Sequence, residues 1–174
     1  MKLSLRNLIS IELVSSVVIL IALSRPWIVA SYSETGFPTV NLSLSANQLS
    51  PSLNGLTLAA IASALGAKAI VEAGTGTGVS GLWLLSGSSQ AVLATIDTET
   101  ENQMIAKRAF TEAKIPANRT RVIHGRAIDV MSNMADAAYD LVFLDADRDT
   151  LEEQLHEASR LLRPGGVVAI AHAL

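Results

Sequence analysis

The sequence predicts an α/β domain with a doubly wound, mostly parallel sheet. Five short apolar runs alternate with segments of helical length, as strands buried on both faces do when helices connect them. A glycine-rich turn follows the first run, and acidic residues lie at the ends of the first, second and fourth. Ligands of such sheets bind at the carboxyl ends of the strands, so the same pattern predicts a small-molecule site.

The first helix is expected from Ser50 and Pro51, an N-cap followed by a proline in the first helical position, to Gly66. Its expected apolar face consists of Leu53, Leu56, Leu58, Ile61 and Leu65. Residues 67–73 form the first expected strand. The glycine turn leads into a helix over 79–85, in which Trp83 is expected to lie in the core.

The remaining elements follow in alternation. Helix 101–114 is expected to turn Met104, Ile105 and Phe110 inward, and the motif Arg163-Pro164-Gly165-Gly166 is expected to turn the chain into the last strand. The expected strands are 91–96, 121–124, 139–144 and 167–171, and the other expected helices are 126–135 and 150–162.

Residues 1–43 differ from the rest and are left unassigned, whereas residues 44–174 are expected to form the domain. Lys2 and Arg6 precede an apolar stretch over 8–23, which resembles a secretory signal, but Glu12 interrupts it. Arg25-Pro26 ends it before the roughly 20 apolar residues that a membrane-spanning helix needs. Three interpretations remain: an export or anchoring signal, a helix packed on a partner subunit, or a stretch translated from an unnatural start codon.

Composition excludes some classes of function. The 174 residues carry a formal charge of −3, and Lys and Arg are scattered, which argues against a general nucleic-acid binder. The chain has no cysteine, so it has neither disulfides nor thiolate metal sites.

The glycine-rich turn has two competing interpretations. Residues 76–81 satisfy the G-x-G-x-x-G pattern of dinucleotide binding, with Asp97 about 20 residues downstream, where a ribose-binding acid belongs. Counted from Glu72, the turn reads acid-x-Gly-x-Gly-x-Gly and resembles the first motif of S-adenosylmethionine-dependent methyltransferases. A turn that only connects a strand to a helix would need fewer glycines.

Residues 50–166 resemble the O-methyltransferase family that includes the catechol and caffeoyl-CoA enzymes. The motifs that carry the resemblance are the run from Ala67 to Ser80, Thr95-Ile96-Asp97, Gly125-Arg126-Ala127, the run from Tyr139 to Asp147, and Leu161-Leu162-Arg163-Pro164-Gly165-Gly166. The resemblance implies a Rossmann-like methyltransferase fold and an S-adenosylmethionine cofactor. It implies cofactor-binding roles for Glu72, Gly74, Thr75, Gly76, Ser80, Asp97, Gly125, Arg126, Ala127 and Asp145, with Ile128 lining the adenine pocket.

Asp145 is also the implied catalytic residue, because the corresponding acid of the family lies beside the methyl donor's amino group and binds a divalent metal. The family's further metal ligands, Asp-Asn, are replaced here by His172 and Ala173. Since magnesium prefers oxygen ligands, no tightly bound magnesium is expected and no metal ligand is assigned. Arg148 stands where the family often has a lysine base and cannot act as one, which leaves Asp147 and His124 as possible bases.

The sequence ends before the last strands of the family sheet, so the final strand is expected to be an open edge unless another chain or the N-terminal segment covers it. A homo-oligomer such as a dimer is therefore expected. The methyl donor is made in the cytosol, which favours a cytoplasmic protein over an exported one or one that contacts the membrane through its N-terminus.

The expected function is methyl transfer from S-adenosylmethionine to a hydroxyl of a small-molecule acceptor. Two alternatives remain: an NAD-type oxidoreductase domain, and a non-catalytic remnant that binds the cofactor and serves as an interaction module.

Overall fold

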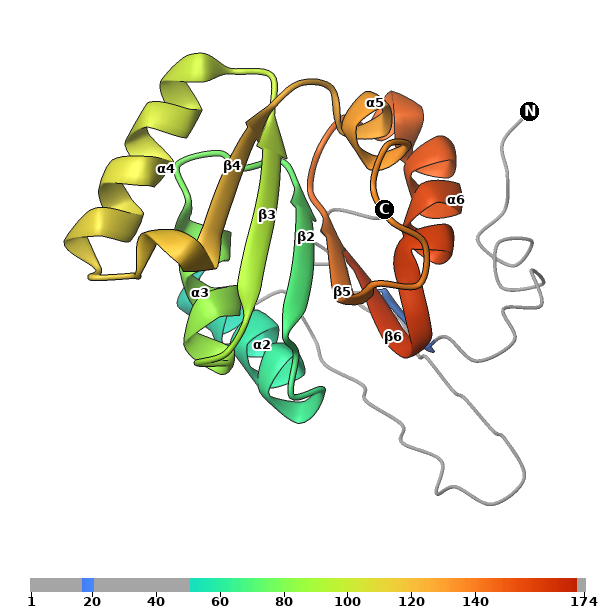
Figure 1. Ribbon diagram of the computed structural model, residues 1–174, viewed down its shortest axis with the longest axis horizontal. Helices are drawn as coiled ribbons and strands as arrows, with labels where there is room; N and C mark the ends of the chain where they lie inside the picture. Colours follow the sequence, from blue (N-terminus) through green and yellow to red (C-terminus); the bar gives the residue numbers. More distant parts are fainter. Residues whose placement is uncertain (1–16, 21–50, 172–174) are drawn as a thin grey trace.

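The computed structural model describes residues 17–20 and 51–171. In this part of the chain six strands form one sheet in the order β1-β6-β5-β2-β3-β4, and each neighbouring pair is parallel. The predicted doubly wound α/β fold is confirmed (Figure 1). The strands are β1 (Val17–Leu20), β2 (Ala69–Ala73), β3 (Val92–Asp97), β4 (Thr120–His124), β5 (Tyr139–Leu144) and β6 (Leu162–Ile170).

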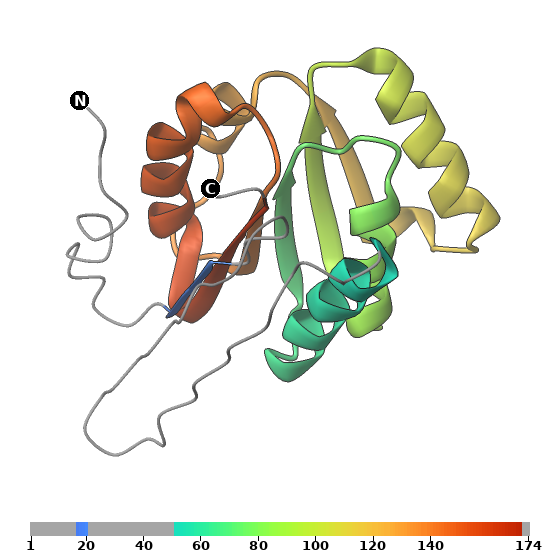
Figure 2. The same cartoon turned by 180° about the vertical axis from the view of Figure 1, so that it is seen from behind.

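Helices cover both faces of the sheet, as the two opposite views show (Figures 1 and 2). One face carries α2 (Pro51–Ala64), α3 (Val79–Gly87) and α4 (Thr100–Glu112), and the other carries α5 (Ala127–Met131) and α6 (Leu151–Leu161). Two short 3₁₀ turns, η2 (Ala117–Arg119) and η3 (Arg148–Thr150), precede β4 and α6.

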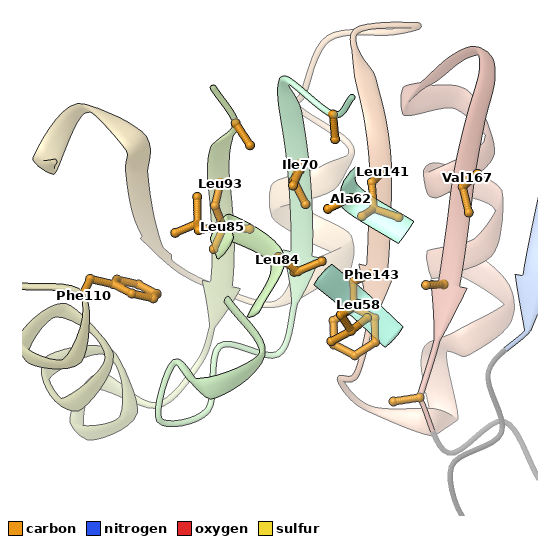
Figure 3. Close-up of a cluster of buried hydrophobic side chains, with 14 of the residues drawn as sticks. Leu58, Ala62, Ile70, Leu84, Leu85, Leu93, Phe110, Leu141, Phe143 and Val167 are labelled. Atoms are coloured by element: carbon orange, nitrogen blue, oxygen red, sulfur yellow. The ribbon is translucent and has the colours of Figure 1, made fainter. Parts of the chain in front are cut away.

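Two hydrophobic layers form because successive side chains of a strand point to opposite faces. In β2, Ile70 packs toward α2 and α3, where it meets Leu58 and Leu84. Its neighbour Val71 packs toward α5 and α6. Figure 3 shows the first layer, in which Phe110 of α4 and Phe143 of β5 also take part.

Asp140 joins three strands at the end of the sheet away from their carboxyl ends. Its Oδ2 atom accepts hydrogen bonds from the backbone N–H groups of Lys68 and Ala69, just before and within β2. Its Oδ1 atom pairs with the guanidinium of Arg163 in β6. Asp140 is 4 % exposed, and these contacts supply the partners that a buried carboxylate needs.

Strand β1 lies beside β6, with Val17 opposite Val167 and Leu20 opposite Ile170. The edge that was expected to be open is therefore covered by a segment from the N-terminal part of the chain, which is one of the two expected covers. Ser50, the domain boundary at 43/44, His172 and Ala173 lie outside the described residues. Within the described residues, no helix has the length and apolar character to cross a membrane.

Three expectations about helix faces are wrong. Met104 and Ile105 are 61 % and 44 % exposed, because the row Gln103, Ala106 and Phe110 is the side of α4 that faces inward. Leu56 is 51 % exposed for the same reason, since α2 turns Gly55, Leu58 and Ala62 inward. In both helices the buried row is spaced i, i+3, i+7, and it is narrower than the apolar pattern suggests.

Two element boundaries also differ. Helix α5 ends at Met131 rather than near 135. Just after Met131, the side chains of Ser132 and Asn133 both hydrogen-bond to the carbonyl of Asp129 and so compete with the helical hydrogen bonds. Strand β6 begins at Leu162 rather than 167. The expected turn at 163–166 lies inside it as an irregularity, because Tyr139 pairs with Leu162 but Leu141 pairs with Val167.

Candidate active site

A cavity of about 770 Å³ lies at the carboxyl ends of β2, β3 and β5. The chain runs from β2 to β3 and β4 on one side and then crosses to β5 on the other, so β2 and β5 flank the switch point where α/β sheets bind ligands. The wall contains Gly74, Thr75, Gly76, Thr77, Val79, Ser80, Trp83, Asp97, Thr98, Asn102, Gly125, Arg126, Ala127, Ile128, Asp145, Asp147, Thr150 and Gln154, together with Gly55, Leu58, Ile96, Phe143 and Ala146.

Backbone hydrogen bonds fix the strand ends that form the floor. Gly74 donates its N–H to the carbonyl of Ile96, and Asp145 donates its own to the carbonyl of Ala73. Gly74 has a φ of +96°, and a Cβ there would lie 2.3 Å from the Asp145 carbonyl oxygen. Glycine is therefore required where the two strand ends approach each other.

Asp97 ties the glycine turn to the end of β3. Its Oδ2 accepts a hydrogen bond of 2.9 Å from the N–H of Gly76, and its Oδ1 accepts one of 2.8 Å from the N–H of Glu99. The buried side chain of Gln103 joins the ends of β3 and β4 by donating to the carbonyls of Asp97 and Ile123. The carboxylate is thus held in one orientation and keeps lone pairs for a ligand at the cavity wall.

The loop after β5 carries two further carboxylates, Asp145 and Asp147. Asp147 accepts from the N–H of Asp149 and caps η3. Gln154, 1 % exposed on α6, donates from Nε2 to the Asp147 carbonyl at 2.9 Å and to the Thr150 hydroxyl at 2.8 Å. The loop is therefore anchored to α6 through one buried amide.

Glu72 lies beneath the cavity wall. It is 0 % exposed and shares the face of β2 with Ile70, so its side chain points toward α3. Its Oε2 accepts a 2.6 Å hydrogen bond from Thr95, which also lies 2.8 Å from the Thr75 hydroxyl. The pKa of Glu72 is raised to about 7, chiefly by burial. Hydrogen bonds from Ser80 and Thr95 oppose the rise, and the negative charges of Asp145 and Asp97 add to it.

The charge of the wall is unequal. Asp97, Asp145 and Asp147 contribute three carboxylates, and Arg126 is the one basic side chain among the lining residues of the described chain. The cavity therefore favours a ligand with positive charge and disfavours one that carries several negative charges.

The structure brings together all the residues predicted to bind the cofactor except Glu72. The lining set includes Gly74, Thr75, Gly76, Ser80, Asp97, Gly125, Arg126, Ala127 and Asp145. The expected contact of Glu72 with a ligand at the wall does not fit its position, because strand alternation turns it into the sheet–helix interface. Of the two possible bases, Asp147 lines the cavity, whereas His124 is exposed on the edge strand β4 and is not among the lining residues.

Sequence reasoning missed an apolar part of the wall. Leu58, Trp83 and Phe143 line it, and Trp83 does so while also packing on the core. A signal was present, because Val79, Ser80 and Trp83 are spaced i, i+1, i+4, and residues three and four apart lie on one side of a helix. Gln154 had no sequence signal, since its role depends on where η3 places the Asp147 carbonyl.

Within residues 17–20 and 51–171, no group of three or more His, Cys, Asp or Glu side chains is gathered as for a metal ion. The positions where the resemblance would place further metal ligands, His172 and Ala173, are not among those residues.

Comparison with known families gives a match over residues 71–171 to a family described as "Methyltransferase domain". A protein from Mycobacterium sp. (strain KMS), provisionally named an O-methyltransferase, is 51 % identical over 131 residues. The match covers 75 % of this chain and 59 % of that protein, so the chain spans little more than half the length of this curated relative.

Two solved structures have a similar fold. The O-methyltransferase TomG of Streptomyces achromogenes, crystallised with SAM, is 30 % identical, with a TM-score of 0.64 over 70 % of this chain and 56 % of TomG. An O-methyltransferase of Bacillus cereus, crystallised with SAH, is 31 % identical, with a TM-score of 0.63 over 72 % of this chain and 58 % of that one.

Proposed function

This chain belongs to the methyltransferase-domain family, and from that premise we propose that it transfers a methyl group from S-adenosylmethionine to a hydroxyl of a small molecule. The observation that carries the proposal is the cavity at the switch point, where the predicted glycines and acids converge from separate strands. The relatives named O-methyltransferases, two of them crystallised with SAM or SAH, support this choice of cofactor and reaction.

The residues of the cavity fit the parts of this cofactor. We assign Asp97 to the ribose hydroxyls, because a carboxylate with free lone pairs accepts from two neighbouring donors. We assign Gly74 and Gly76, which line the cavity, to the methionyl part, and Ser80 lies at the start of α3, where the positive end of the helix dipole favours a carboxylate. Arg126 and Ala127 are assigned to the adenine, next to Ile128.

When bound, S-adenosylmethionine supplies an electrophilic methyl group on a positively charged sulfur. Asp145 is the proposed catalytic residue, because it lines the cavity at the end of β5 and can hold an ammonium group there. We assign to Asp147, which lines the cavity, the role of accepting a proton from an acceptor hydroxyl, and orientation of the reactants would supply the remaining rate enhancement.

The dinucleotide alternative fits the charge of the cavity less well. NAD carries a pyrophosphate with two negative charges, and three carboxylates against one guanidinium in the wall would repel it. The sulfonium and ammonium groups of S-adenosylmethionine are cationic, so the same wall attracts them.

Calorimetric titration with S-adenosylmethionine, S-adenosylhomocysteine and NAD tests the proposal. The first two ligands should bind and NAD should not. Asp97→Ala should weaken S-adenosylmethionine binding roughly 10- to 100-fold, since hydrogen bonds to a charged group contribute about 1.5–3 kcal/mol. Glu112→Gln, at an exposed position at the end of α4, serves as the control and should bind like the wild type.

A methyl-transfer assay with a panel of hydroxyl compounds, with and without magnesium, then separates an enzyme from a non-catalytic remnant. Transfer to at least one acceptor that falls in Asp145→Asn supports the enzyme. Cofactor binding without transfer to any acceptor would favour the remnant, and NAD binding alone would favour the oxidoreductase.

The proposal extends to the setting of the protein. A cytoplasmic location follows from the site of synthesis of the methyl donor, and a homo-oligomer such as a dimer stays a prediction from the sequence. Light scattering of the purified chain measures the second, and fractionation of cells that express it measures the first.

A further inference from the structure

Glu72 is a buried acid that the proposed reaction does not use. Its carboxyl lies between β2 and the first turn of α3, where a Cβ on Gly81 would come within 3.2 Å of Oε2. Oε2 is occupied by the hydroxyl of Thr95, and Oε1 has no hydrogen-bond partner among the described residues. A carboxylate with one unpaired oxygen at 0 % exposure is costly, so this position favours the protonated form.

The same carboxyl is linked to the floor of the cavity through hydroxyl groups. Thr95 connects it to Thr75 of the glycine turn. A hydrogen bond from Ser80, at the start of α3, lowers the pKa of this carboxyl. Thr75 and Ser80 both line the cavity. Only one or two side chains therefore separate Glu72 from a ligand in the cavity. The charge of the ligand would act on this carboxyl strongly, because charges in the interior are weakly screened.

The charged groups that act on Glu72 are Asp145 after β5 and Asp97 at the end of β3, and both are negative. No cation among the described residues offsets them at this carboxyl. A positively charged ligand placed between these acids would reverse the balance and favour the ionised form of Glu72.

We propose that Glu72 is a positioning residue for the cofactor turn, and that its carboxyl releases a proton to solvent when the positively charged S-adenosylmethionine binds above it. The inference rests on the proposed function. Cofactor binding would thus be coupled to one buried proton, and the coupling would be stronger for the cationic donor than for its product, whose sulfur is uncharged.

The experiment is calorimetric titration of the full chain with S-adenosylmethionine in buffers of different ionisation enthalpy, which counts protons released per ligand bound. Because the pKa of Glu72 in the free protein is about 7, the wild type should release about half a proton more than Glu72→Gln at pH 7. If the bound ligand keeps Glu72 ionised, the difference should approach one proton near pH 6, and it should vanish above about pH 8.5. Protons that belong to the ligand cancel, because both proteins bind the same molecule.

Two variants separate titration from a merely structural effect. Thr95→Val removes a hydrogen bond to the carboxyl but keeps the acid, so proton release should persist. His156→Gln changes an exposed side chain of α6 that does not line the cavity, and release should match the wild type. S-adenosylhomocysteine should give a smaller difference between wild type and Glu72→Gln than S-adenosylmethionine does.

Equal proton counts in wild type and Glu72→Gln would overturn the inference while leaving the proposed function intact. The inference would also be overturned if Thr95→Val lost proton release as completely as Glu72→Gln does. The released proton would then depend on the hydrogen-bond network and not on the carboxyl of Glu72. If neither adenosyl ligand binds, the proposed function fails, and this inference fails with it.

Discussion

Glu72 should make the stability of the folded chain depend on pH. Its pKa is about 7 in the folded protein and near 4.5 when the side chain is exposed, so between these values the folded state holds the proton more tightly. The free energy of unfolding should therefore fall as pH rises from about 4.5 through 7, by about 3 kcal/mol in total. The stabilising contribution is complete below the unfolded pKa and lost above the folded one.

Chemical denaturation of the wild type and Glu72→Gln over this pH range measures the effect. The amide cannot ionise, so the difference between the two curves isolates Glu72, and the variant should be the more stable protein at pH 8. The exposed control Glu112→Gln should give a curve parallel to the wild type. A wild type and a Glu72→Gln variant whose curves run parallel would contradict the pKa assigned to this carboxyl.

At the scale of single residues, strand ends were predictable and side-chain direction was not. Asp97 and Asp145 follow apolar runs typical of strands in a parallel sheet, and Gly125 follows a shorter, mixed segment. Their meeting at one edge could be predicted from the order of these segments. Glu72 is one residue before such an end. Because side chains alternate along a strand, Glu72 points to the face of the sheet opposite to that of Ala73, and this face is packed against α3.

At the scale of elements, α2 and α3 meet through Gly55 and Trp83. A Cβ at Gly55 would lie 2.1 Å from the indole Nε1, so Gly55→Ala should force the ring or the helix to move. We expect a loss of about 1–3 kcal/mol in the free energy of unfolding, as for other overpacked sites. Cofactor binding should weaken as well, because Trp83 lines the cavity.

A double-mutant cycle with Trp83→Phe checks this prediction by denaturation and by titration with cofactor. The smaller ring should accept the added methyl group, so the two substitutions should couple favourably. Ser63→Ala on the exposed side of α2 controls for the gain in helix propensity and should not destabilise. Additive effects of Gly55→Ala and Trp83→Phe would mean that the contact is not the cause.

The elements themselves were predictable to different degrees. Strands β2, β3 and β5 were expected within two residues, because continuous apolar runs bounded by turns leave little choice. The inner face of α4 could not be predicted in this way. Met104 and Ile105 are apolar yet exposed, whereas the buried row consists of Gln103, Ala106 and Phe110. Small and polar residues can form a buried row, and hydrophobicity alone does not reveal it.

At the scale of the whole molecule, β1 is brought from the N-terminal part of the chain to pair with β6 at one side of the described sheet. In a parallel pair, alternate residues of each strand direct their backbone groups toward the neighbour. One of the two variants Val18→Pro and Ile19→Pro should therefore lose an N–H that hydrogen-bonds to β6. The other should lose an N–H that points away from β6.

Hydrogen exchange of the β6 amides between Val167 and Ile170 measures the difference. Protection should fall clearly in one proline variant and stay close to the wild type in the other. Equal behaviour of the two variants, whether both are protected or both are exposed, would show that β1 does not pair with β6 in the described register.

The pairing of Val17 with Val167 has a consequence for biosynthesis. A ribosome that adds roughly 5–20 residues per second needs on the order of ten seconds to pass from one strand to the other. During that time the nascent β1 has no strand to pair with, and the apolar segment is open to chaperones. Translation speed, and not only thermodynamics, should then influence the yield of correctly assembled sheet.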